Sequence, residues 1–168
     1  SRILDFAQRI AATGKNVNLT TAQILGLAAS VLSMGFESEL GATAVGQALI
    51  KIQEAVVTGG RELEIIAQTA GLTVREFSDL WRQDALAAFT AFAGGIGQQG
   101  ENAALVIREI GLEGFRAINV LQALGRGEDI LRSSTDRASA ALEANTALQE
   151  EFGKRANTAA ADATRTWN

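Results

Sequence analysis

The chain has 168 residues, a formal net charge of −4 from 15 basic and 19 acidic side chains, and no Cys, His, Tyr or Pro. Without Cys and His, it lacks the usual ligands of zinc, a thiol nucleophile and an imidazole base. The two charge signs are mixed along the sequence, whereas a nucleic-acid site would need a clustered basic face. We therefore expect no catalytic residues, metal, cofactor or direct nucleic-acid binding.

The balance of proline and glycine predicts an all-α fold. At ordinary usage of about 5%, a chain of this length would hold roughly eight prolines, which break helix interiors. Instead it has 17 glycines and 47% hydrophobic residues. The β-branched residues are scattered through helical periods and do not alternate as in strands. We expect a well-filled helical core with joints at glycines.

Helical spacing of apolar residues places the predicted elements. In chain order, these helices begin near residues 3, 20, 38, 61, 73, 85, 102, 113 and 128. Thr20 and Thr73 are expected to open theirs through capping boxes, and Ser38 and Asp84 through their side chains alone. The glycines expected to end helices or to lie just beyond them are Gly14, Gly35, Gly59, Gly71, Gly94 and Gly125.

The most apolar run, residues 85–96, leads into a glycine-rich stretch at residues 94–100. A membrane-spanning helix needs about 20 apolar residues, so this run predicts a buried helix. No strand pattern precedes the glycines and no Gly-Lys-Ser/Thr follows them, which disfavours a phosphate loop. Because the sequence starts at Ser1 without a signal pattern, we expect it to be a piece of a longer protein.

From Glu128 onward the chain is rich in Ala, Glu and Arg, and Gly153 is its one glycine. We therefore divide the chain into a compact helical domain, residues 1–126, and a long amphipathic helix, residues 127–168. At 100° per residue, one side of this helix is mainly apolar. The candidate seam or oligomer contacts on that side are Leu131, Ala138, Leu142, Asn145, Leu148 and Phe152.

Asn145 is polar within this apolar side, which leaves three interpretations. It fixes register and copy number in a multimeric bundle, it caps a loop of its own domain, or it faces water. Similarly, Gly26, Gly41 and Gly46 inside predicted helices mark either a contact face for another protein or close helix packing. We favour close packing for the glycines.

Three carboxylate pairs and one aromatic pair complete the set of candidates. Two carboxylates can hydrolyse a glycosidic bond, but these pairs lie at predicted surface positions with no aromatic sugar platform. They are Glu37 with Glu39, Glu62 with Glu64, and Glu150 with Glu151. We interpret them as solvated, and Phe77 with Trp81, four residues apart on a helix, as core.

Short motifs that follow one another in a fixed order give the chain a resemblance to a known protein family. In the first half they are Leu25-Gly26, Ala28-Ala29, Met34-Gly35-Phe36, Glu39, Gly41, Thr43-Ala44, Ala55-Val56, Thr58-Gly59-Gly60, Leu63, Ala67, Ala70-Gly71-Leu72-Thr73, Glu76-Phe77 and Trp81. In the second half they are Asp84-Ala85, Ala88-Phe89, Ile110-Gly111-Leu112, Arg116, Val120-Leu121, Glu143, Asn145-Thr146-Ala147-Leu148-Gln149, Glu151-Phe152 and Arg155. From about Ile3 to Ala160, the chain resembles the tail tape measure proteins of bacteriophages and prophages.

The resemblance implies a non-enzymatic structural protein of the phage tail that sets tail length and templates tube assembly. Its implied partners are the tail tube protein, a tail assembly chaperone and other copies of itself. Its implied location is the tail lumen of the virion, and the host bacterial cytoplasm during assembly. Two alternatives remain: a tail-associated peptidoglycan hydrolase and a membrane-penetrating segment.

Overall fold

The computed structural model describes the backbone of residues 1–112 and 115–167; the side chains of residues 115–116, 148–149, 152 and 155–167 lie outside the description. Over the described residues the chain is helical and has no strand, which confirms the all-α prediction. The helices are α1 (Arg2–Asn16), α2 (Thr21–Ser33), α3 (Ser38–Thr58), α4 (Arg61–Thr69), α5 (Val74–Gln83), α6 (Ala85–Gln99), α7 (Ala103–Glu109), α8 (Phe115–Arg126) and α9 (Glu128–Trp167), with a 3₁₀ turn, η1, at Gly100–Asn102.

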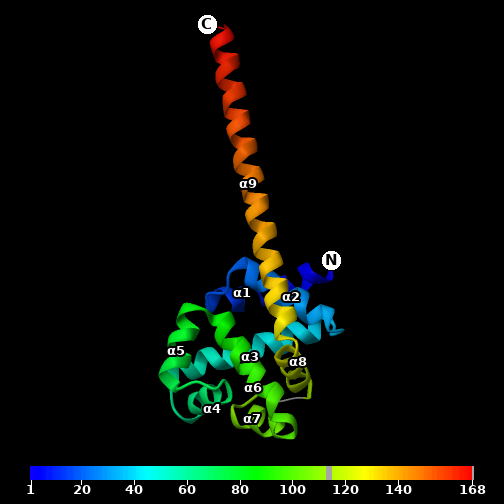
Figure 1. Ribbon diagram of the computed structural model, residues 1–168, viewed down its shortest axis with the longest axis vertical. Helices are drawn as coiled ribbons and strands as arrows, with labels where there is room; N and C mark the ends of the chain where they lie inside the picture. Colours follow the sequence, from blue (N-terminus) through cyan, green and yellow to red (C-terminus); the bar gives the residue numbers. More distant parts are fainter. Residues whose placement is uncertain (113–114, 168) are drawn as a thin grey trace.

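Helices α1 to α8 gather into a globule, from which α9 projects as a single rod that carries the C-terminal end away from it (Figure 1). The core of the globule draws on all the helices from α1 to α8 and on the first turn of α9. Each fully buried Leu, Ile or Phe side chain contributes about 1.5–3 kcal/mol. The largest side chains below 2% exposure are Phe6, Phe77, Phe89, Phe92, Ile10, Leu27, Leu49, Ile52, Ile66, Ile96, Ile107 and Ile110.

The aromatic pair predicted for the core is confirmed there. Phe77 and Trp81 stack with their ring centroids 6.3 Å apart, and both side chains are buried. The indole Nε1 of Trp81 donates a hydrogen bond to Gln53 Oε1 at 2.7 Å. This bond satisfies the one polar atom of the ring and fixes α5 against α3.

Both predicted capping boxes are present. Thr20 Oγ1 accepts from the backbone N of Gln23 at 3.1 Å, and the Gln23 side chain accepts from the Thr20 backbone N at 2.9 Å. Thr73 and Glu76 make the same pair at the start of α5, and the hydrogen bonds from the Thr73 backbone and side chain hold the Glu76 pKa below its usual value. The predicted cap of α6 is also confirmed, because Asp84 Oδ1 accepts from the backbone N of Ala87.

The prediction that Ser38 caps α3 is wrong. Glu37 occupies the N-cap position without a side-chain hydrogen bond, and Ser38 is the first residue of the helix. Ser38 Oγ instead donates to Asp5 Oδ2 at 2.6 Å and so joins α3 to α1. This bond, followed by the one from Arg9, lowers the pKa of Asp5. The hydroxyl serves a tertiary contact that helix-end statistics do not reveal.

Several glycines that were expected to end helices lie inside them. Gly14 is within α1, Gly94 and Gly95 are within α6, which continues to Gln99, and Gly125 is within α8. By contrast, the predicted ends at Gly35, Gly59 and Gly71 are correct, and each of those residues has a positive φ. Glycine therefore has two roles in this chain: it ends helices, and it lets them approach one another.

Gly95 shows the second role most clearly. A β-carbon built on Gly95 would overlap the carbonyl oxygen of Thr69, and it would lie 2.6 Å from the carbonyl carbon of the same residue. The last turn of α4 is thus in contact with the bare backbone of α6. Gly125 on α8 meets the carbonyl oxygen of Ala93 in the same way. Close packing explains Gly95, and a β-carbon on Gly97 would lie 3.4 Å from the carbonyl carbon of Gly125.

We predict opposite effects for alanine at two adjacent positions of α6. Gly95→Ala forces the α4 and α6 backbones apart and should lower the unfolding free energy by about 1–3 kcal/mol. Gly94→Ala adds a methyl group where no atom lies within 4 Å, and it should raise stability by up to about 1 kcal/mol through helix propensity. Urea titrations of both variants measure this difference, and equal effects would refute the close contact.

Candidate protein-interaction site

The lower part of α9, residues 128–138, is called the root of α9 below. It packs mainly against α2 and only slightly against α8. A β-carbon on Gly26 of α2 would lie 2.7 Å from the Cα atom and 2.9 Å from the backbone N of Thr135. The two backbones therefore touch at this point, and Gly26 determines how closely the projecting helix sits on the globule.

The six predicted seam residues differ in how deeply the structure buries them. Leu131 is 1% exposed and is part of the core, so its side chain is already packed within its own chain. Ala138 and Leu142 are half-buried and Asn145 is exposed on the projecting part of α9. The side chains of Leu148 and Phe152 lie outside the described residues. Within a single chain Asn145 faces solvent, and its role in a bundle stays a prediction.

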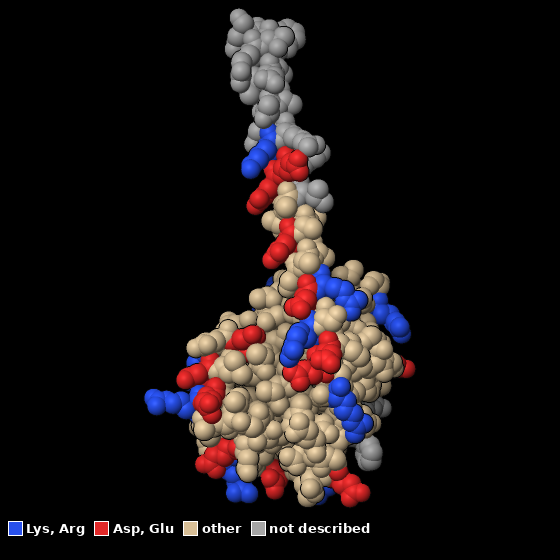
Figure 2. Space-filling view, in the orientation of Figure 1, with Lys and Arg blue, Asp and Glu red and all other residues tan. Residues whose placement is uncertain are grey.

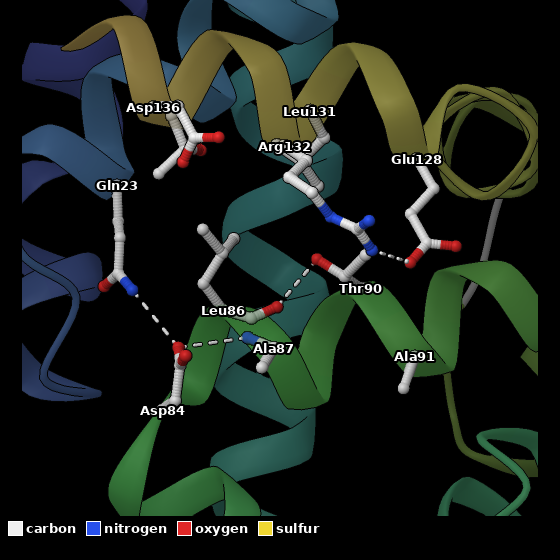
Figure 3. A pocket seen from close by; sticks show the side chains of 11 residues that line it. Gln23, Asp84, Leu86, Ala87, Thr90, Ala91, Glu128, Leu131, Arg132 and Asp136 are labelled. Carbon is white, nitrogen blue, oxygen red and sulfur yellow. Dashed lines mark hydrogen bonds and ion pairs between the residues drawn. The ribbon is translucent and has the colours of Figure 1, made fainter. Parts of the chain in front are cut away.

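A hollow of about 300 Å³ lies on one side of the root, between α2, α6 and α9 (Figure 3). Leu86 and Leu131 form part of its apolar wall, and the carboxyl groups of Asp84, Glu128 and Asp136 lie around it. Asp84 Oδ1 accepts from Gln23 Nε2 at 3.1 Å, which ties the start of α6 to α2. The hollow offers both apolar surface and carboxylate oxygens to a protein side chain.

Arg132 supplies the positive charge of this hollow. Its Nη2 atom lies 3.0 Å from Glu128 Oε1, one turn earlier on α9. Both side chains are largely exposed, so the pair contributes at most about 1 kcal/mol. Acidic and basic side chains are interspersed over this face of the globule, with no extended patch of one sign (Figure 2).

A second hollow of about 300 Å³ lies on the other side of the root, between α1, α2 and α9. Its walls are mostly apolar, and they include Ile3, which is 41% exposed, together with Leu25, Ala29 and Ala138. The seam prediction missed the first three of these residues because they lie on other helices. Their exposure depends on where α9 leaves the globule, which sequence periodicity does not show.

Two of the three glycines considered as contact positions are explained by packing inside the chain. Gly26 faces Thr135, and a β-carbon on Gly41 would lie 3.1 Å from Phe6 Cε2. Gly46 has no atom within 4 Å of its hypothetical β-carbon. Close packing therefore accounts for Gly26 and Gly41 but leaves Gly46 without a structural reason.

The described carboxylates bear on the hydrolase alternative. Glu62 lies 3.4 Å from Lys51 Nζ in an ion pair, and Glu37, Glu39 and Glu64 are exposed. Asp5 and Glu76 have lowered pKa values, the opposite direction from a general acid, and neither lines a hollow described above. Among the described residues, no three His, Cys, Asp or Glu side chains are grouped to hold a metal ion.

Helix length and hydropathy bear on the membrane alternative. In the described part of the chain, no helix is both long enough and apolar enough to cross a bilayer. The longest helix, α9, carries charged residues along its whole described length. The apolar α6 is shorter and lies in the core.

We predict that Gly26→Ala loosens the root of α9. The added methyl group meets backbone atoms of Thr135, which can move only if α9 shifts, so docking should weaken by about 1–3 kcal/mol. Amide hydrogen exchange at residues 132–138 measures this opening. Gly46→Ala is the matched control, and it should leave exchange at those amides unchanged. Equal exchange in the two variants would show that Gly26 does not hold the root.

None of the family models, curated proteins or solved structures compared with this chain matches it. The likeness to tape measure proteins thus depends on the ordered motifs between Ile3 and Ala160. The geometry adds a helical globule, a projecting rod and two hollows beside its root. The second hollow exposes apolar surface beside the root of α9.

Proposed function

We propose that this chain is a structural module of a phage tail tape measure protein and acts through protein contacts. The observation that carries the proposal is α9, a helix of 40 residues that leaves the globule as a rod. At about 1.5 Å per residue, it extends roughly 60 Å. A rod of this kind converts residue number into distance linearly, as a ruler of tail length requires.

The two parts of the chain have different roles in this proposal. The globule folds its residues into a compact body, so it adds little length per residue. The part of α9 beyond the root adds length in proportion to its residues. We infer that the globule is a docking or end piece and that the rod leads into, or begins, the extended tape.

The partners in this proposal are the tail tube protein, a tail assembly chaperone and other copies of the chain, inside the tail lumen. The supporting features are the half-buried Leu142 on the rod and the apolar hollow that the half-buried Ala138 lines at the end of the root. Each leaves apolar surface that another chain can cover. Asn145, exposed on the same rod, would set the register between copies.

Tail length tests the ruler directly. In the phage or prophage that encodes the parent protein, deletion of residues 139–159 should shorten the tail by about 30 Å. Duplication of the same residues should lengthen it by the same amount. Tail lengths averaged over many particles by electron microscopy measure both changes.

The control replaces residues 139–159 with a helix-forming sequence of equal length. It keeps the rise and changes the side chains, so the tail should keep its normal length. If the deletion and the duplication both leave tail length unchanged, this stretch is not part of a ruler. Clearing of purified cell walls by the isolated chain would instead support the hydrolase alternative.

Self-association through the seam can be tested with two neighbouring positions on α9. Leu142→Lys places a charge on the apolar side, and it should weaken association of the purified chain at least tenfold. Glu143→Lys introduces the same side chain at an adjacent, exposed position, and should have little effect. Sedimentation equilibrium measures both. A wild-type chain that stays monomeric, or equal loss in the two variants, would argue against the seam.

A further inference from the structure

The joint between α8 and α9 consists of a single residue, Gly127. Its backbone N donates to the Ala123 carbonyl at 2.8 Å, and the backbone N of Leu131 donates to the Gly127 carbonyl at 3.0 Å. Both bonds have the i→i−4 spacing of an α-helix. The chain therefore keeps helical hydrogen bonds on each side of the joint, although the two helices point in different directions. Figure 3 shows α9 running across the view while α8 is seen nearly end on.

Gly127 belongs to neither α8 nor α9, so the helix is interrupted there. In a continuous helix the backbone amides of residues 128–130 would donate to α8. If the joint straightened, these three amides would face the carbonyls of residues 124–126 at helical spacing. Residues 115–167 would then form one continuous helix. That helix would carry the root of α9 off its own α2.

The packing of the root on α2 favours such a release. The root lies between the two hollows, so α2 is its principal support. Two hydroxyl groups are buried without a hydrogen-bond partner: Thr135 Oγ1 on α9 and Ser30 Oγ on α2. Ser30 lies one helical turn after Gly26. Buried hydroxyls without partners regain hydrogen bonds to water when a contact opens. The α2–α9 contact thus has a lower opening cost than a fully satisfied one.

A released root leaves apolar surface uncovered, including Leu131, which is 1% exposed in the bent chain. The surface that fits it is α2 of an identical chain, because the complementary shape at Gly26 and Thr135 is the same in every copy. We propose that two copies exchange the root of α9 through straightening at Gly127. Each root then packs on α2 of its partner, with the same contacts that the single chain makes internally.

Gly127 is the position at which this equilibrium can be shifted. Gly127 does not have a positive φ, so alanine is compatible with its backbone. In the bent chain, however, a β-carbon would lie 2.5 Å from Met34 Cε and 3.1 Å from the Ala123 carbonyl oxygen. In a straight helix, alanine is favoured over glycine by about fivefold per chain, or about 25-fold for a dimer.

The first experiment measures dimerisation of the purified chain by light scattering over a concentration series. Gly127→Ala should raise the association constant about 25-fold. Gly153→Ala is the matched control: Gly153 lies in α9 with no atom within 4 Å of its hypothetical β-carbon, so it adds helix propensity equally to both states. An association constant for Gly127→Ala no higher than that of the control would overturn the proposal.

The second experiment identifies which chains are in contact. The sequence has no Cys, so single spin labels can be attached at Ile3→Cys in one preparation and Arg137→Cys in another. Both positions are exposed and line the same hollow, and Ile3 stays with the globule when α9 moves. After the two preparations are refolded together at high concentration, exchange places the two labels side by side.

Pulsed electron spin resonance should then show a short distance between the two labels, which increases in population when both chains also carry Gly127→Ala. If two chains instead associate side by side along their rods, position 137 of each chain stays next to position 3 of the same chain. The two labels, which are on different chains, then give no short distance. Absence of the short distance in the mixed sample would overturn the exchange, even if dimers form. Its failure would leave the proposed tape function standing, since tail length tests that function separately.

Discussion

Gly26 permits α2 and α9 to touch through their backbones at Thr135, and the direction of the long helix follows from that contact. With a larger residue at position 26, the root would have to lift from the globule and lose the burial of Leu131 and Ser134. The root has a hollow on each side because α9 rests chiefly on this one helix. The rod is therefore positioned chiefly by its contact with α2.

The same physical device recurs within the globule. Gly95 and Gly125 bring α4 and α8 against the backbone of α6, which contributes buried side chains to the core. In a chain without proline, glycine also marks the ends of helices at Gly35, Gly59 and Gly71. Because one residue type has both roles, glycine positions alone do not reveal whether a helix stops or is crowded by a neighbour.

This ambiguity explains what the sequence could and could not predict. Helix class, the capping boxes and the core position of Trp81 depend on local hydrogen bonding and on periodicity, so they were predicted correctly. The continuation of α6 past Gly94 and the bond from Ser38 to Asp5 depend on helices distant in sequence, so they were missed. For the candidate site, periodicity identified the apolar side of α9, but not that Leu131 is buried by its own chain or that Ile3 and Leu25 extend the surface.

The proposed function depends chiefly on the projection of α9 as a rod from a docked root. Small-angle X-ray scattering of the dilute monomer tests it most directly. Residues 139–167 extend about 40 Å as helix, so the pair-distance distribution should have a globular peak followed by a long, low tail of about that length. A single symmetric peak of the size of the globule would contradict the rod, because it would mean that α9 folds back onto α1–α8.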